Sequence, residues 1–577
     1  AQLRGFRMSN WVFPRGVTIN LTYAPRISLG LDRLTQVSNT LGRAIDFNYD
    51  VSDVLTGFDN SLSGSDARST SLSSAGTGPG QTTTTFLDAL GNSTRGVYSR
   101  VGERYELTDV YDADDTTIPS LRYTYDALYH VSEARDAEAL QGARNPYQFR
   151  IVTRALGERQ DPQTPTAGIF LVLFDDQERP FRYIDEIART TNLVHDGRSR
   201  VTNTTFPELD QEQIAYDGRN RITQLRRVAV PGSSLSDIVI GASWNDTWNK
   251  PASITDARGY QTDFTYVASG NGAGELLTAT RPAPSGAAPF GTGARPVYSF
   301  TYGSFGRLAT STDPTNLATS NSINATTGNI TSTTVDPGIS PHVNATSSFA
   351  YDAQGDQVSV TDPRGNVTET AHDAMRRPTT VLHHNGGVAA ALLAAERRTY
   401  NGLGQVTSTE GGTAFSGTSV TAWLTRESRT YTHTGQVATI TDALSHTTAT
   451  AYDDLDRVLS VTDPVSRVTR HEYDLAGQET REIRAYGSTI QQDYARYTYA
   501  PNGQRLSMRD ANNNRSVYVY DGFDRPCRLY FPVTTSGANA ANLGAGGVEG
   551  SIGCSDGARA GEDYEGYSYD ANSNRTS

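Results

Sequence analysis

The chain has 577 residues and a net charge of −13, and only 36% of its residues are hydrophobic. An acidic surface repels phosphate backbones, so nucleic acid is excluded as an expected partner. No stretch approaches the roughly 18 apolar residues that a bilayer span needs, so we expect no membrane span. Gly (53) and Tyr (30) are abundant while Met (3) is rare, which is typical of many short strands joined by many turns.

In chain order, we expect one continuous repeat architecture over residues 1–577, beginning with divergent repeats in 1–64. Residues 65–82 are rich in Ser, Gly and Thr, and their composition predicts a loop. Residues 531–561 are Gly-rich and predict an insertion between two repeats. Two stretches, 136–142 and 388–398, have helical composition, and we expect them to be short insertions rather than domains.

A tyrosine recurs where an alternating strand pattern ends, and we call this residue the anchor of a repeat. The spacing between anchors is 21 residues in four cases: 351 to 372, 431 to 452, 452 to 473 and 499 to 520. A fixed interval indicates one supersecondary unit repeated along the chain. The predicted anchors are Tyr125, Tyr216, Tyr302, Tyr351, His372, Tyr400, Tyr431, Tyr452, Tyr473, Tyr499, Tyr520 and Tyr569.

The residue four positions after each anchor predicts a tight turn. Gly, Asn and Asp tolerate positive φ, so this position favours a left-handed backbone. Asp often follows the anchor directly and can accept hydrogen bonds from the turn's own amides. The Gly residues at this position are Gly306, Gly355, Gly404, Gly435, Gly477 and Gly503. Asn220, Asp456 and Asp524 also fit, whereas Tyr129, Arg376 and Ser573 depart from the pattern.

A second turn is predicted eleven residues after the anchor. Asp stands there in five repeats, often before Pro or Ala, and Pro fixes φ at a corner. Between the turns, runs such as 457–463 alternate with period two, which indicates strands. Each repeat is therefore a β-hairpin that leads into the next. The five residues are Asp313, Asp362, Asp442, Asp463 and Asp510.

A hairpin of 21 residues cannot bury its own face in water, so neighbouring hairpins must stack. The predicted fold is an all-β hairpin solenoid, and the twist of such a sheet winds it into a spiral or tube. Cys527 and Cys554 flank much of the Gly-rich insertion. We predict a disulfide between them, in an oxidising compartment, because closing a Gly-rich loop stabilises the fold; two unrelated thiols are the alternative.

Tyr-Asp, Gly-Arg and Thr-Asp-Pro in this register resemble the YD repeats of the Rhs family. That family includes bacterial Rhs proteins, the shell-forming C components of insecticidal toxin complexes, and teneurins. The resemblance covers nearly the whole chain and implies a hollow β-shell built from a spiralling strip of hairpins. In the toxins such a shell encloses a C-terminal toxic domain, and in teneurins it is an extracellular adhesion scaffold. The family's self-cleavage motif, Asp-Pro-x-Gly, occurs at 362–365, but inside an ordinary repeat corner, so no cleavage residue is assigned.

The sequence predicts no catalytic, cofactor-binding or metal-binding residue. It has neither the G-x-S-x-G nucleophile motif nor the H-E-x-x-H zinc motif. His383 and His384 lie in a stretch that predicts an exposed hairpin tip, with metal binding as the lesser interpretation. His372 replaces a tyrosine anchor and is expected to be a packed or half-exposed strand residue. We therefore expect a protein that is not an enzyme.

Three functional hypotheses follow. The first is a non-catalytic structural scaffold, secreted or at the cell surface, whose uncapped ends pair with other copies in a head-to-tail filament. The second is the encapsulating shell of an Rhs-type toxin, with an enclosed C-terminal cargo as partner. The third is a cell-surface adhesin or carbohydrate-binding module that uses Tyr, Asn and Asp on one sheet face.

Overall fold

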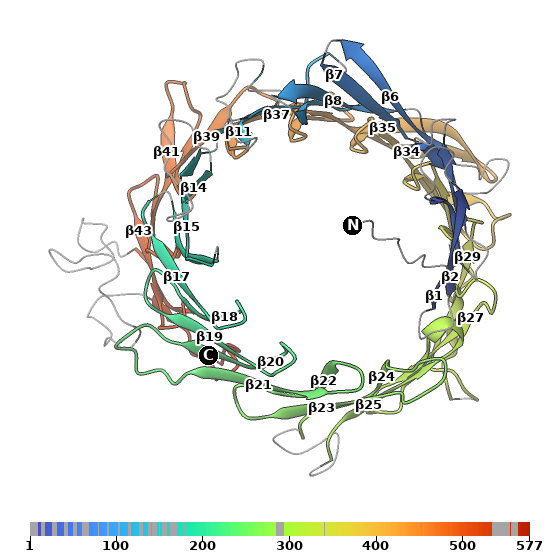
Figure 1. The fold of residues 1–577 in the computed structure, drawn as a ribbon, viewed down its shortest axis with the longest axis horizontal. Helices are drawn as coiled ribbons and strands as arrows, with labels where there is room; N and C mark the ends of the chain where they lie inside the picture. The colour runs from blue at the N-terminus through green and yellow to red at the C-terminus, as the bar shows by residue number, and fades with distance from the viewer. Residues whose placement is uncertain are drawn as a thin grey trace. The chain divides into compact units, whose positions relative to one another are not determined.

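In the part of the chain that it describes, the computed structural model is almost entirely antiparallel β-structure, with a short 3-10 turn, η2 (Ser304–Gly306), between β25 (Val297–Tyr302) and β26 (Leu308–Thr312). Figure 1 shows the strands as a succession of arrows that follow the chain order. The prediction of an all-β fold built from hairpins is confirmed. The structure describes residues 10–12, 18–25, 32–39, 44–49, 55–59, 69–78, 80–88, 90, 92–101, 104–113, 117–125, 131–136, 140, 147, 148, 150–152, 158–161, 170–177, 179–185, 187–283, 294–339, 341–453, 455–532, 554 and 564–576.

The first sheet has 12 strands, and each is hydrogen-bonded to its neighbours in sequence. The strands are β1 (Asn10–Val12), β2 (Thr18–Pro25), β3 (Asp32–Asn39), β4 (Ala44–Tyr49), β5 (Leu55–Asp59), β6 (Ser69–Gly78), β7 (Gln81–Leu87), β8 (Ser93–Val101), β9 (Arg104–Tyr111), β10 (Leu121–Tyr125), β11 (Val131–Asp136) and β12 (Tyr147–Gln148).

The second sheet has 33 strands in the same unbroken order. Its first half comprises β13 (Arg150–Val152), β14 (Glu158–Asp161), β15 (Phe170–Phe174), β16 (Pro180–Ile184), β17 (Thr190–His195), β18 (Val201–Thr205), β19 (Gln211–Tyr216), β20 (Ile222–Val228), β21 (Ile238–Asn245), β22 (Lys250–Thr255), β23 (Gln261–Tyr266), β24 (Leu276–Thr280), β25 (Val297–Tyr302), β26 (Leu308–Thr312), β27 (Ala318–Ile323) and β28 (Ile330–Val335).

The second half of that sheet contains the repeats with the most regular spacing. It comprises β29 (Ala345–Tyr351), β30 (Gln357–Thr361), β31 (Val367–His372), β32 (Pro378–His384), β33 (Leu392–Tyr400), β34 (Val406–Ser416), β35 (Ser419–Tyr431), β36 (Val437–Asp442), β37 (Thr447–Tyr452), β38 (Val458–Thr462), β39 (Val468–Tyr473), β40 (Glu479–Arg484), β41 (Gln492–Tyr499), β42 (Arg505–Asp510), β43 (Arg515–Tyr520), β44 (Pro526–Tyr530) and β45 (Tyr564–Gly566).

The chain forms two compact units, and each collects segments that are far apart in the sequence. The first unit comprises Ala1–Arg122, Thr262–Thr430 and Thr441–Ser445. The second comprises Tyr123–Gln261, Tyr431–Ile440 and His446–Ser577. Within the second unit, early repeats therefore pack against late repeats.

A β-bulge marks the anchor in most repeats, because the pairing register shifts by one residue there. In β39, for example, Glu472 pairs with Arg481 but Tyr473 pairs with Glu479. A bulge adds local twist and re-aims the side chain, so each strand ends with a bend into its turn. The same shift reveals anchors that the tyrosine pattern missed, namely Phe174, His195, Trp244, Tyr266 and Ile323.

Two expectations from composition are wrong. Residues 65–82 are not simply a loop, because Ser69–Gly78 forms β6 and pairs with β7. Residues 388–398 are not helical, because Leu392–Tyr400 forms β33 between two neighbouring strands. In both stretches, the backbone hydrogen bonds offered by neighbouring strands override local composition.

The remaining expectations of this kind fall largely outside the described residues. Of the stretch 136–142, the structure describes Asp136, which ends β11, and residue 140. Of the expected insertion 531–561, it describes Phe531, Pro532 and Cys554.

Few of the described residues are completely buried. In the second unit, Val517, Val519, Cys527 and Tyr530 form one small buried cluster. Ala229, Ile238 and Phe523 form another, in which the early and late repeats meet. Most strand residues are only half-buried, so hydrogen bonds and turn geometry contribute much of the cohesion.

Candidate functional site

The turn after each anchor that the sequence predicted has a left-handed residue at its fourth position, wherever the structure describes that position. All eleven described residues there have φ between 59° and 89°, including Arg376 and Ser573, which the residue pattern set apart. These two side chains follow the turn geometry of the repeat at a cost in backbone strain. The eleven are Asn220, Gly306, Gly355, Arg376, Gly404, Gly435, Asp456, Gly477, Gly503, Asp524 and Ser573.

The Asp after the anchor caps this turn. In one repeat, Asp217 Oδ1 accepts hydrogen bonds from the backbone amides of Arg219 (2.8 Å) and Arg221 (3.0 Å). The carboxylate thus satisfies amides that a tight turn leaves without partners.

An arginine five positions after the anchor connects two neighbouring repeats. Arg457 donates through Nε to Asp453 Oδ2 (2.7 Å) in its own turn. Its Nη1 donates to the backbone carbonyl of Asp474 (3.3 Å) in the next anchor turn. Its guanidinium also lies over the ring of the next anchor, Tyr473, with Cζ 4.5 Å from the ring centroid. We call this Asp–Arg–aromatic arrangement the clasp.

The clasp recurs in both units. The arginines that bond both their own turn and the following anchor turn are Arg179, Arg200, Arg221, Arg377, Arg457 and Arg525. Hydrogen bonding from these arginines is the main reason that the pKa of Asp175, Asp196 and Asp217 falls to about 2. The guanidinium groups that also lie over the ring of the following anchor, and so complete the clasp, are those of Arg200, Arg221, Arg377, Arg457 and Arg525. The Gly-Arg pair is visible in the sequence of the repeats, but this role of the arginine was not predicted. The signal that could have identified it is the constant offset of five residues from the anchor.

The anchor hydroxyl closes the hairpin that the anchor ends. Tyr473 Oη donates to the Val458 carbonyl at 2.8 Å, and Tyr520 Oη donates to the Arg505 carbonyl at 2.9 Å. The acceptor is the first residue of the hairpin's other strand. The same bond is made by Tyr216, Tyr302, Tyr351, Tyr400, Tyr452, Tyr499 and Tyr569.

The second turns, at the opposite edge of the strip, are capped in the same way by their own Asp. Asp463 Oδ1 accepts from the amides of Val465 (3.0 Å) and Arg467 (2.8 Å), and the Arg467 side chain returns to Asp463. Each of these turns also has a left-handed residue, with φ between 63° and 86°. Those residues are Asn316, Gly365, Ser445, Ser466 and Asn513.

In the second unit, second turns of early repeats meet anchor turns of late repeats. Val230 N donates to the Gly522 carbonyl at 3.0 Å. Arg258 pairs with Asp570 (Nη1 to Oδ2, 3.2 Å). Gly522 is required for this approach, since a Cβ there would stand 2.6 Å from Ser233 Oγ. We call the row of successive hairpins the strip, and each stretch of it that packs against another stretch a pass. The contact between the early and the late pass is the edge contact.

Three carboxylates gather at the edge contact. Glu208 and Asp210 lie in the turn after β18, and Asp524 lies in the turn after β43. Burial, together with the charge of Asp524, raises the pKa of both Glu208 and Asp210, and burial raises that of Asp524. Asp210 is 4% exposed, and its Oδ1 has no hydrogen-bond partner among the described residues. Arg227 is the cation that partly offsets this charge.

The His383–His384 stretch was expected to be an exposed tip, and for His384 this is wrong. His384 is 1% exposed, whereas His383 is exposed. His384 Nδ1 faces the Ala390 carbonyl (3.0 Å) and Nε2 faces Glu369 Oε2 (2.9 Å). The two ring nitrogens thus hold the side chain between the turn after β32 and the neighbouring strand β31. The strand alternation, which turns every second side chain inward, was the signal that could have identified His384 as buried.

The two cysteines are joined. The Cys527–Cys554 disulfide has a Cα–Cα distance of 5.6 Å and a sequence separation of 27 residues. It ties β44 to the far end of the Gly-rich stretch. Cys527 itself is 5% exposed and belongs to the buried cluster around Val517.

Among the described residues, no group of three or more His, Cys, Asp or Glu side chains is arranged to hold a metal ion. In the same part of the chain, no helix has the length and apolar character needed to cross a bilayer. The clasps and the edge contact, which lie along the two edges of the strip, form the candidate functional site.

Part of the chain matches a known repeat family. The RHS Repeat model matches residues 351–389, 431–464 and 452–489. The sequence has no significant match among curated proteins.

Among solved structures, the crystal structure of TcdB2-TccC3-TEV resembles this chain with a TM-score of 0.53 at 12% identity. The match covers 90% of this chain and 31% of that one, so this chain spans about a third of its neighbour. TcdB2-TccC3-Cdc42 matches at a TM-score of 0.42 and 11% identity, over 92% of this chain and 30% of that one. The Photorhabdus luminescens Tc holotoxin pore matches with a TM-score of 0.40 at 12% identity, and the match covers 98% of this chain and 26% of that one. The first of these similarities supports the fold.

Proposed function

Because this RHS-repeat chain folds into antiparallel strips of hairpins, we propose that it is a wall segment of an Rhs-type shell, a secreted, non-catalytic scaffold that encloses a cargo. The observation that carries the proposal is the edge contact of the second unit. Strips that stack edge to edge can form a continuous wall, whereas a strip with two free edges would make no such contact between distant repeats. The clasps supply cohesion along the strip, and the edge contact supplies it across the strip.

The sequence favoured a head-to-tail filament as its first hypothesis, and the edge contact favours the shell instead. In a filament, the important contacts lie between the terminal strands of different copies. In a shell, they lie between successive passes of one chain. Val230–Gly522 and Arg258–Asp570 belong to one chain and are separated by about 300 residues, as a winding strip requires.

Cross-linking between introduced cysteines tests the proposal. The native cysteines are bonded to each other, so in an Arg258→Cys/Asn572→Cys variant only the new pair is free to react with a short bismaleimide. We expect an intramolecular 258–572 cross-link, detected by mass spectrometry at the monomer mass. The matched control is Arg258→Cys/Asn512→Cys, which places the second cysteine in a second turn of a late repeat.

The outcomes separate the hypotheses. A cross-linked monomer in the test variant and none in the control supports the shell. Cross-links that appear only at the dimer mass, with periodic filaments in electron micrographs, would replace the shell by the head-to-tail scaffold. Equal cross-linking of both variants would show that the edges are not in register and would remove the basis of the proposal.

A further inference from the structure

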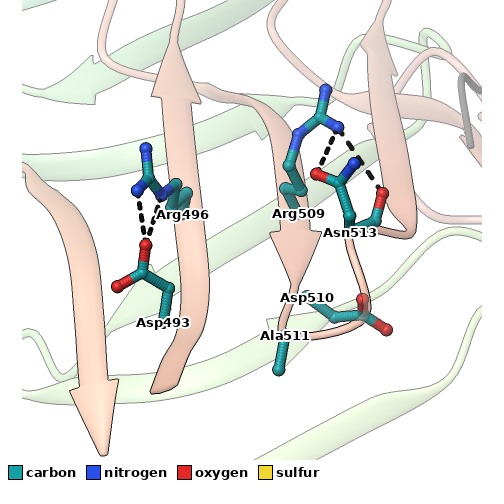
Figure 2. Close-up of a pocket in the computed structure, with 6 residues that line it drawn as sticks. All are labelled: Asp493, Arg496, Arg509, Asp510, Ala511 and Asn513. Carbon is teal, nitrogen blue, oxygen red and sulfur yellow. Dashed lines mark hydrogen bonds and ion pairs between the residues drawn. The ribbon is translucent and has the colours of Figure 1, made fainter. Parts of the chain in front are cut away.

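A hollow of about 360 Å³ lies at strands β41 and β42 of the second unit. Figure 2 shows the six residues that line it: Asp493, Arg496, Arg509, Asp510, Ala511 and Asn513. Its volume lies within the range of small-molecule sites, although its walls are mainly polar. Neither the clasps nor the edge contact uses these side chains.

Two arginines lie directly opposite each other in this hollow. Arg496 in β41 and Arg509 in β42 are register partners across the strand pair. Like charges at opposed positions of a sheet repel and destabilise the pair unless a counter-charge lies between them.

The two carboxylates of the hollow already accept hydrogen bonds from other groups. Asp493 Oδ2 bonds Arg496, while its Oδ1 bonds Arg481 from the neighbouring strand. Asp510 Oδ1 accepts the amides of Asn512 and Asn514, as in the other second turns. Each carboxylate is therefore held by groups other than Arg509.

Arg509 has no anionic partner among the described residues. Its Nη1 donates to the neutral Asn513 side chain (Oδ1, 2.7 Å) and, more weakly, to the Asn513 carbonyl (3.5 Å). Figure 2 shows the Arg509 guanidinium beside Asn513, with Asp510 turned away from it. The hollow thus contains a guanidinium whose charge nothing on its walls neutralises, opposite a second one.

We propose that this hollow binds a small anionic ligand of about monosaccharide size that carries a carboxylate or phosphate group. Arg509 provides the charged fork for the anion, since guanidinium groups bind both oxyanions in a bidentate manner. Arg496 and Asn513 provide further donors at the sides. The anion also supplies the counter-charge that Arg509 lacks, whereas Arg496 already pairs with Asp493. This site is independent of the shell, because it requires only the β41–β42 hairpin.

Titration calorimetry on the full chain tests the site with three probes: inorganic phosphate, glucuronate and neutral glucose. We expect one of the two anions to bind and glucose not to bind, and the stronger anion identifies the ligand class. Arg509→Gln should weaken anion binding at least about tenfold, because a charge-assisted hydrogen bond is lost. The matched control is Arg467→Gln, which removes an exposed arginine outside the hollow and should leave binding unchanged.

A second variant keeps the test independent of folding. Asn513→Asp retains Arg509 but gives it a carboxylate partner, so it should also abolish anion binding. An absence of binding for both anions to the wild-type chain overturns the site. Equal weakening by Arg467→Gln also overturns it, since binding would then reflect overall charge.

Discussion

Turns at both edges of the strip can be capped by an Asp–Arg pair, but only at the anchor edge does the arginine also bond the next repeat. At the anchor edge, Arg457 bonds its own Asp453 and then extends to the next repeat. At the second-turn edge, Arg467 pairs with Asp463 and its side chain is 71% exposed. The same residue type, placed four positions after an Asp in both cases, connects repeats at one edge and not at the other.

The difference shows that cohesion along a hairpin strip comes from its anchor edge. There the tyrosine supplies a ring for the guanidinium and a hydroxyl for the hairpin, so three interactions share one arginine–tyrosine pair. The second-turn edge lacks an aromatic residue at the matching position and exposes apolar side chains such as Leu444 (76%) and Val465 (68%). Its stabilising partners within the second unit come from another pass of the strip.

Acid should have the largest effect, because it acts on many clasps at once. The folded-state pKa of Asp175, Asp196 and Asp217 is about 2, below the usual 3.8. A depressed folded pKa contributes stability above pH 3.8 that is lost as the pH falls towards 2. We expect unfolding to begin in this window, as measured by circular dichroism. Arg200→Gln should move the titration midpoint of Asp196 in NMR back towards 3.8, and an unchanged midpoint would contradict the clasp.

The variants Arg457→Ala and Arg467→Ala test the difference between the anchor edge and the second-turn edge directly. The first removes a half-buried clasp, and we expect it to destabilise the chain by about 1–3 kcal/mol. The second removes an exposed ion pair and should cost less than about 0.5 kcal/mol. Urea denaturation measures both. If the two losses were equal, the proposed asymmetry between the edges would be wrong.

The carboxylates at the edge contact should respond to pH with the opposite sign. The pKa of Glu208, Asp210 and Asp524 is raised, so their contribution is present below their unfolded pKa and is lost as the pH rises through the higher folded values. Asp210→Asn should therefore raise the melting temperature more at pH 7 than at pH 4. Asp237→Asn, which removes a surface carboxylate paired with Arg226, is the control and should show no such gain.

Tyr473→Phe removes the hydroxyl that closes a hairpin while the ring beneath Arg457 remains. We expect a loss of about 0.5–1.5 kcal/mol, the value of one ordinary hydrogen bond. Tyr486→Phe, at a partly exposed tyrosine that anchors no repeat, should be neutral. Equal denaturation midpoints for the two variants would show that the anchor hydroxyl contributes nothing.

Ser466→Gly should give the smallest change, and it should be stabilising. Ser466 has φ of 63°, which a serine adopts at a cost and glycine adopts freely. We expect a gain of at most about 1 kcal/mol in chemical denaturation. Ser460→Gly, inside β38, should instead destabilise by roughly 0.5–1 kcal/mol, because glycine weakens a strand. A loss at both positions would indicate that the second turn carries no strain.

The sequence by itself determined the local architecture. Gly355, Gly477 and Gly503 stand where the backbone must be left-handed, and Asp463 stands where a turn needs an acceptor, because such requirements involve only a few consecutive residues. Alternation between the turns specified strands for the same reason. The clasp was also encoded locally, although its arginine was recognisable only by a constant offset.

Only the tertiary structure decided which residues meet across long separations. Gly522 had no sequence signal, yet it permits the approach of Ser233 from nearly 300 residues earlier. Asp210 and Asp524 each resemble ordinary turn residues until packing places them together and raises their pKa. His384 was misread for the same reason, because burial depends on the neighbouring strand and not on the histidine pair itself. Turn geometry is a property of a few adjacent residues, whereas burial and edge contact are properties of how a long strip packs against itself.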